Sequence, residues 1–267
     1  FLFKMKKKIL IIGKKSFIGS NLKNYLSKYF DVNAISYEDI KNKNKILSSS
    51  SHIINTSIHK NYINKKYDKK FDLDRKIITD LGQKKFIYFF LNSRKIYLPK
   101  FNISESSKLK PKDNYAKNKL ITENKIQLLL KKKFLILRVA NIIGKPIKNP
   151  NKVSKNFIDN YIEYKKKNKN IKYVNYFKDF LSVNQFTTIF LSIVNNNLNG
   201  IYNVSLGKKV FIAEILSWLN KHNNKIFRPI NKIKNNDSFY LNNEKLLKKI
   251  NIKIKKSDLK KYCLNFN

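Results

Sequence analysis

The feature that most constrains the fold is a glycine-bounded turn, Gly13–Gly19, between an apolar run and a helical pattern. Residues 8–12 have the apolar, β-branched composition of a strand that is buried on both faces. After Ser20 apolar residues recur at helical spacing, and a second strand-like run follows at 32–35. Strand, turn, helix and strand in this order predict a parallel sheet with a right-handed crossover.

The same alternation continues along the chain. Apolar runs at 52–55, 85–91, 134–138 and 201–204 are typical of further strands, and residues 115–131 carry a helical pattern. We therefore predict an α/β fold, a doubly wound and mainly parallel sheet with a small C-terminal lobe. The predicted sheet domain spans 5–145, with 173–204 returning to the sheet. The predicted substrate-binding lobe comprises 146–172 and 205–267.

The glycine-bounded turn also suggests a ligand. Backbone N–H groups at the start of a helix bind a pyrophosphate, and glycines let strand, turn and helix pack closely. We expect this role for Gly13, Ser16, Phe17, Ile18 and Gly19. Ser16 occupies the middle position, where a glycine normally lets the phosphates approach. A strand-to-helix turn without any ligand is the alternative.

A second candidate site consists of Ser93, Tyr115 and Lys119. Tyr115 and Lys119 lie four residues apart in the predicted helix and so share one face. A nearby ammonium lowers the pKa of a phenol, which suits Tyr115 for proton transfer. Ser93 follows a predicted strand, at the sheet edge where α/β proteins bind ligands. Because the chain is rich in lysine, a Tyr and a Lys four residues apart are a common pattern. The pattern indicates a catalytic site only together with Ser93.

Composition excludes several other classes. The 267 residues include 58 Lys+Arg against 17 Asp+Glu, a formal charge of +41, but only four of the basic residues are Arg. A phosphate-gripping surface favours Arg, so we interpret the lysines as a solvated surface and keep a basic nucleic-acid-binding protein as an alternative. A single cysteine, Cys263, excludes a disulfide framework and fits a cytoplasmic protein. The spacing of the histidines predicts no metal site, and no apolar run is long enough to span a membrane.

These residues together resemble a family, the extended short-chain dehydrogenase/reductases of the NAD-dependent epimerase/dehydratase type, which act on nucleotide sugars. The turn is similar to the family's G-x-x-G-F-I-G, and 110–123 to P-x-x-x-Y-x-x-x-K-L-x-x-E. Segment 92–97 resembles S-S-x-x-V-Y, 137–146 resembles L-R-x-x-N-x-x-G-x-P, and 178–185 resembles R-D-F-x-x-V-x-D. Residues 53–57 and 200–204 resemble the family's N-x-A and G-x-Y-N-V segments. Seven matches in order cover nearly the whole chain.

The resemblance implies a Rossmann-like domain that binds NAD or NADP and a nucleotide-sugar substrate. Tyr115 would transfer the proton, Ser93 would hydrogen bond the same sugar oxygen, and Lys119 would bind the nicotinamide ribose. Further residues implied in cofactor binding are Asn55, Thr56 and Ser57, and those implied in substrate binding are Asn141 and Arg228. The expected activity is that of a 4-ketoreductase or an epimerase, and a homodimer is compatible with this class.

Departures from the family pattern narrow this expectation. Sugar 4,6-dehydratases of the family carry Asp-Glu after the catalytic hydroxyl, whereas this chain has Arg94 and Lys95, so dehydratase activity is disfavoured. The end of the second strand has no acidic residue for an adenosine ribose, and Ser36 with nearby lysines favours NADP while leaving NAD open. Because Ser16 replaces a glycine, a catalytically impaired cofactor-binding protein of the same fold is a further alternative.

Overall fold

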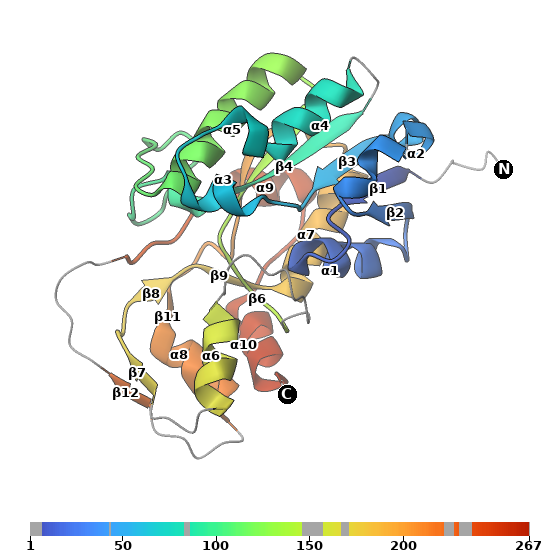
Figure 1. The fold of residues 1–267 in the computed structure, drawn as a ribbon. Coiled ribbons are helices and arrows are strands. Elements are labelled where there is room, and N and C mark those ends of the chain that lie inside the picture. The colour runs from blue at the N-terminus through green and yellow to red at the C-terminus, as the bar shows by residue number, and fades with distance from the viewer. Residues whose placement is uncertain are drawn as a thin grey trace.

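In the computed structural model of the chain, six parallel strands form a central sheet in the order β10-β5-β4-β3-β1-β2 (Figure 1). The structure describes residues 7–42, 44–82, 86–145, 157–166, 171–221, 227–229 and 237–266. The strands of the sheet are β1 (Lys8–Ile12), β2 (Asp31–Ile35), β3 (His52–Asn55), β4 (Ile87–Ser93), β5 (Phe134–Val139) and β10 (Gly200–Val204). This six-stranded sheet confirms the predicted Rossmann-like fold class.

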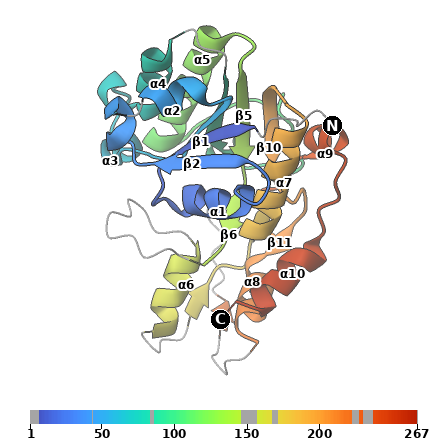
Figure 2. The ribbon, with the colours of Figure 1, turned by 90° about the vertical axis from the view of Figure 1, so that its right-hand side faces the viewer.

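The sheet is buried on both faces, as its apolar strands require. Successive side chains of a strand point to opposite faces, so Ile9 and Ile11 pack into one core and Leu10 and Ile12 into the other. Helices α1 (Phe17–Leu26) and α7 (Val183–Asn195) cover the first face. Helices α2 (Asn44–Ser49), α4 (Leu73–Leu81) and α5 (Asn114–Leu130) cover the second, as Figure 2 shows. A short helix, α3 (Lys60–Asn64), packs against α5.

Short strand pairs and helices form a lobe at one end of the sheet (Figure 1). The pairs are β6 (Asn141–Ile143) with β9 (Phe180–Ser182), β8 (Phe177–Lys178) with β11 (Val210–Phe211), and β7 (Ile171–Tyr173) with β12 (Phe227–Pro229). The lobe's helices are α6 (Phe157–Lys166), α8 (Ile212–Leu219) and α10 (Lys256–Leu264). Helix α9 (Glu244–Ile250) packs instead on β10 and α7. Residues 146–156 and 167–170 of the predicted lobe lie outside the described residues.

Short 3-10 helices in the described ranges are η1 (Glu38–Asn42), η2 (Lys69–Phe71) and η3 (Arg94–Ile96). The first follows β2 and the third follows β4. Both lie where strands of a parallel sheet end, and ligands of this fold class bind at that edge. The side chains of η1 and η3 therefore lie near the candidate site.

Candidate active site

The glycine-bounded turn has the close packing that a dinucleotide-binding turn needs. Gly13 has φ +103°, and a Cβ there would lie 2.5 Å from Thr56 Oγ1. A Cβ on Gly19 would overlap the carbonyl oxygen of Gly13. The N–H groups of Gly13 and Lys14 donate to the Ile35 carbonyl at 2.8 and 3.1 Å, which fixes the turn against the end of β2. Larger residues at Gly13 or Gly19 would force the turn apart.

Ser16 caps helix α1. Its hydroxyl accepts the Gly19 N–H at 2.9 Å and donates to Thr56 Oγ1 at 2.7 Å. The Thr56 hydroxyl in turn donates to the Ile12 carbonyl at 2.8 Å. The Ser16 side chain is thus held between the helix terminus and the end of β3. The turn, with its positive φ, tight contacts and helix N-terminus, fits a pyrophosphate-binding site despite the serine.

The remaining predicted cofactor residues divide into two groups. Asn55 is buried, and its amide group accepts the Ser57 N–H at 2.9 Å while donating to the Ser57 carbonyl at 3.2 Å, which shapes the loop after β3. Phe17 packs instead against Gly144, where a Cβ would lie 2.5 Å from its ring. The Ile18 side chain packs on the core beneath α1. The structure therefore brings Gly13, Ser16, Gly19, Thr56 and Ser57 together, whereas the side chains of Phe17 and Ile18 serve packing.

Ser93 and Tyr115 meet at the carboxyl end of β4. Ser93 is the last residue of that strand, and its hydroxyl accepts the Lys95 N–H at 3.2 Å. Tyr115 lies in the first turn of α5, where Asp113 caps the helix. Burial and the charge of Asp113 raise the pKa of Tyr115 to about 12, although a hydrogen bond from Ser93 favours the ionised form. The phenol is therefore a neutral proton donor at physiological pH.

Lys119 lies one turn further along α5 and is buried. Its ammonium donates to the Leu91 carbonyl at 3.0 Å and lies 4.4 Å from the centre of the Phe90 ring. Burial lowers the pKa of Lys119, while the charges of Asp74 and Asp72 oppose this change. The pKa of Tyr115 is raised overall, so the expected lowering by Lys119 does not dominate in this structure. The ammonium is directed to the strand and to Asp74.

The two cations that follow Ser93 are both engaged in ion pairs. The Arg94 guanidinium donates to both oxygens of Asp237 at 3.0 and 2.9 Å and stacks on Phe239 at 3.9 Å. Lys178 donates to the same carboxylate at 2.9 Å. Burial acts to raise the pKa of Asp237, but hydrogen bonds from these two cations outweigh it and lower the pKa to about 2. Lys95 pairs with Asp113 at 3.0 Å.

The two predicted substrate residues lie in strands of the lobe. Asn141 begins β6, and its side-chain amide donates to the Asp179 carbonyl at 3.2 Å. Arg228 lies in β12, next to Lys172 of β7, and its side chain lies outside the described residues.

Sequence reasoning missed two acids near the site, Asp74 and Asp39. Asp74, in the first turn of α4, is only 5% exposed and lies 3.9 Å from Lys119 Nζ. Asp39, in η1, accepts the Ser36 N–H at 3.3 Å and lies 3.5 Å from Lys14 Nζ. An acid three residues after a serine is a helix-capping pattern, so the position of Asp39 could have been found. The sequence around Asp74 carries no signal of its burial.

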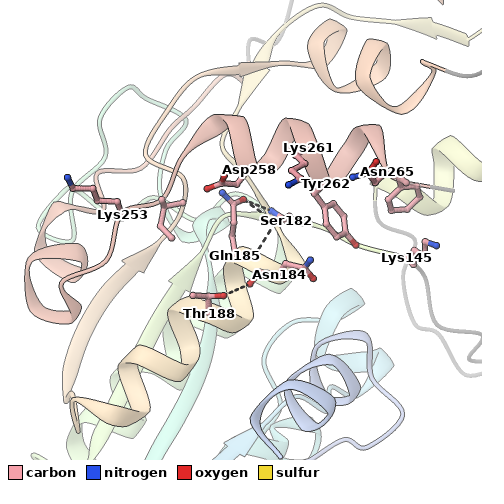
Figure 3. Close-up of a pocket in the computed structure, with 12 residues that line it drawn as sticks. Lys145, Ser182, Asn184, Gln185, Thr188, Lys253, Asp258, Lys261, Tyr262 and Asn265 are labelled. Carbon is pink, nitrogen blue, oxygen red and sulfur yellow. Dashed lines mark hydrogen bonds between the residues drawn. The ribbon is translucent and has the colours of Figure 1, made fainter. Parts of the chain in front are cut away.

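A pocket of about 530 Å³ lies between the start of α7 and helix α10 (Figure 3). Gln185, Lys253 and Tyr262 are among its lining residues, and none of the predicted site residues lines it. Within the described ranges no cluster of His, Cys, Asp and Glu could hold a metal ion. No helix in those ranges is both long and apolar enough to cross a bilayer.

Solved structures share this fold, whereas no family model and no curated protein sequence matches the chain. UDP-N-acetylglucosamine 4-epimerase from Methanobrevibacter ruminantium, solved with UDP-N-acetylmuramic acid, is 17% identical with a TM-score of 0.81, over 98% of this chain and 97% of that one. UDP-glucose 4-epimerase from Thermotoga maritima, solved with UDP-glucose, is 15% identical with a TM-score of 0.75, over 97% of each chain. RMD from Pseudomonas aeruginosa, solved with NADPH, is 15% identical with a TM-score of 0.75, over 98% of this chain and 96% of that one.

The chain shares with these structures a Rossmann-like α/β fold built on a six-stranded parallel sheet. The chain has this fold over nearly its whole length, which confirms the resemblance inferred from its motifs at the level of the fold.

Proposed function

We propose that the chain is an NAD(P)-dependent oxidoreductase that acts on a nucleotide sugar. The observation that carries this proposal is the meeting of Ser93 with Tyr115 at the carboxyl end of β4, with Lys119 one turn further along α5. The glycine-bounded turn ends β1 of the same parallel sheet. Structures of the same fold were solved with UDP-glucose and with NADPH, which supports both ligand classes. A single cysteine also fits the cytoplasm, where we place this reaction.

In the proposed reaction, Tyr115 donates its phenolic proton to the oxygen of a sugar ketone. Ser93 hydrogen bonds the same oxygen and stabilises the charge that develops there. A bound NAD(P)H supplies the hydride. The buried ammonium of Lys119 contributes positive charge beneath the site and would bind the nicotinamide ribose. The turn between Gly13 and Gly19 would hold the pyrophosphate, and we propose Asn141 and Arg228 as contacts of the nucleotide sugar.

We propose a 4-ketoreductase ahead of an epimerase, because a protonated Tyr115 suits the first step of ketone reduction. A reductase needs a proton donor at the start of its reaction, and the pKa of about 12 keeps the phenol protonated. An epimerase begins by removing a proton from a sugar hydroxyl, which requires Tyr115 to act first as a base. Arg94 and Lys95 are held by Asp237 and Asp113, so the positions after Ser93 offer no acid-base pair for a dehydratase.

The test is cofactor oxidation with a panel of 4-keto nucleotide sugars. Tyr115→Phe removes the proton donor and should lower kcat by a factor of about 100 or more while leaving NADPH or NADH binding within about twofold. Tyr25→Phe, on α1 and also beside a lysine, should retain wild-type turnover.

Two other results would count against this proposal. Cofactor binding without turnover, unchanged by Tyr115→Phe, would indicate the catalytically impaired alternative. Failure of the wild-type chain to bind either NADH or NADPH would show that the proposal is wrong.

A further inference from the structure

A buried carboxylate, Asp74, connects the candidate catalytic lysine to the core of the sheet. Its Oδ1 accepts hydrogen bonds from Asn55 at 2.9 Å and from the Tyr88 hydroxyl at 2.8 Å. Its Oδ2 lies 3.9 Å from Lys119 Nζ. Both donors belong to strands of the sheet, Asn55 to β3 and Tyr88 to β4, so the sheet fixes the orientation of the carboxylate. Desolvating a charge is costly, and a buried acid with such contacts calls for an explanation.

Lys119 is the cation that Asp74 meets. Its ammonium donates a hydrogen bond to the Leu91 carbonyl at 3.0 Å and forms an ion pair with the Asp74 carboxylate at 3.9 Å. A second buried acid, Asp72, accepts hydrogen bonds from Thr122 and Tyr67, each at 2.8 Å, and its charge also favours the protonated lysine. Two acids therefore oppose the desolvation of one ammonium. Both acids favour the protonated lysine, although burial has the larger effect and lowers the pKa of Lys119 overall.

Asp74 also acts on Tyr115. Its negative charge disfavours the phenolate and adds to the effect of burial and of Asp113 on the pKa of Tyr115. The groups that face Tyr115 or Lys119 come from four elements and two helix caps. They are Ser93, Lys95, Tyr62, Phe90, Asp72, Asp74 and Asp113. Among these, Asp74 is the one whose charge acts on both the tyrosine and the lysine.

We propose that Asp74 is the positioning residue of this site: it anchors the Lys119 ammonium at the end of β4 and holds Tyr115 as a proton donor. The proposal rests on the proposed function for its catalytic meaning. Through hydrogen bonds from Asn55 and Tyr88, Asp74 connects the acid-base pair to β3, which leads into the loop that contacts the cofactor turn, and to β4, which ends in the catalytic serine. A neutral side chain of the same shape would keep the packing but lose both electrostatic effects.

Nuclear magnetic resonance of tyrosines labelled with ¹³C at Cζ tests the effect on Tyr115 without any substrate. Tyr115→Phe identifies the resonance. In the wild-type chain this resonance should remain that of a phenol up to about pH 11, since burial and nearby acids oppose ionisation. In Asp74→Asn its midpoint should fall by roughly a few tenths of a pH unit, because burial and Asp113 have larger effects than Asp74. The matched control is Asp80→Asn, an exposed acid of the same helix, which should leave the midpoint unchanged. Equal midpoints in the wild-type chain and Asp74→Asn would overturn the proposal.

A double-mutant cycle in urea unfolding tests the anchoring of Lys119. Asp74→Asn and Lys119→Met should each lower the unfolding stability, because each leaves one buried charge without its partner. Each substitution raises the unfolding equilibrium constant by some factor. In the double variant the increase should be smaller than the product of the two single factors, by about threefold or more. Effects that simply multiply would overturn the pairing. If Asp74→Asn alone does not fold, recovery of folding in the double variant supports the proposal and failure of recovery contradicts it.

These measurements separate the proposal from the proposed function. A chain that binds no NADH or NADPH and reduces no keto sugar would refute the function, while the Tyr115 titration and the cycle would still decide the role of Asp74. With an active enzyme, Asp74→Asn should also move the alkaline limb of the kcat/KM profile to lower pH by the same amount as the resonance midpoint. A purely structural Asp74 would lower activity equally at every pH.

Discussion

Ser16 shows how one side chain can depart from a motif and leave its geometry intact. Its hydroxyl is satisfied by the Gly19 N–H and by Thr56, so the extra atoms lie between the turn and β3. The two glycines that the packing requires, Gly13 and Gly19, are both present. Asp39 is held in a similar way by local backbone, because its carboxylate accepts the Ser36 N–H and so caps η1. That contact places a carboxylate at the end of β2, where the sequence had suggested no acid.

Asp39 should therefore influence the choice of cofactor. A carboxylate at the end of this strand accepts a hydrogen bond from the adenosine ribose and repels a 2′-phosphate. Asp39→Asn should raise the affinity for NADPH relative to NADH by about three- to tenfold, an effect limited by solvent and by Lys14. Fluorescence titration with both cofactors measures this ratio. Glu38→Gln, an exposed acid in the same turn, serves as control, and an unchanged ratio in Asp39→Asn would rule out this role.

At the scale of elements, several motif residues form a buried polar network between α5 and the sheet. Glu123 of α5 forms a buried ion pair with Arg138 of β5 and accepts a hydrogen bond from Asn92 of β4. Arg138 also donates to the Tyr97 hydroxyl at 2.6 Å, and Tyr97 donates to Asn203 of β10 at 3.0 Å. One polar network thus connects α5, which carries Tyr115 and Lys119, to three neighbouring strands.

Removal of Glu123 should uncouple this network. Glu123→Ala leaves the Arg138 guanidinium buried without its carboxylate, which should cost about 3–5 kcal/mol of unfolding free energy. Urea unfolding followed by circular dichroism measures this loss. Replacing both partners, in Glu123→Ala/Arg138→Met, should restore part of it. Lys117→Ala, at an exposed position of α5, should change the stability by less than about 0.5 kcal/mol. A small effect of Glu123→Ala would show that the network contributes little.

Patterns local in sequence predicted the elements, whereas contacts between distant segments decided the electrostatics of the site. The run at 8–12 and the glycines after it predict a buried strand and a tight turn because backbone geometry alone imposes them. Ser93 and Tyr115 could be placed at one sheet edge from strand order. The raised pKa of Tyr115 could not be predicted, because its largest cause is burial, which only the fold decides; Asp113, two positions away, and the distant Asp74 add to it. Local spacing to Lys119 suggested the opposite shift.

At the scale of the whole molecule, two acids join the lobe to the sheet domain. Asp237 receives Arg94 from the end of β4 and Lys178 from the lobe. Asp179, fully buried between β8 and β9, accepts the N–H groups of Leu206, Gly207 and Leu241 at 2.8, 3.1 and 3.1 Å. Both acids thus bind groups from segments that lie far apart in the chain.

Asp179 should give the fold a distinct dependence on pH. Burial raises its pKa to about 7, although backbone hydrogen bonds oppose the shift. An unfolded aspartate titrates near pH 4, so between about pH 4 and 7 the folded state binds more protons than the unfolded state. This group's contribution to the free energy of unfolding should therefore fall as pH rises through that range, by on the order of 3 kcal/mol, and level off above it.

Asp179→Asn isolates this contribution, because other groups titrate in the same range. His52, whose pKa burial lowers to about 4, contributes the opposite slope in both chains. The quantity to measure is the unfolding free energy of the wild-type chain minus that of Asp179→Asn, from urea titrations at pH 4.5 to 8. It should decrease as pH rises and become constant above about pH 7.5, because the asparagine does not titrate. Asp258→Asn, an exposed acid of α10, should give a difference with little slope. Parallel curves for the wild-type chain and Asp179→Asn would mean that the buried carboxyl titrates alike in the folded and unfolded states, and that its hydrogen bonds fully offset its burial.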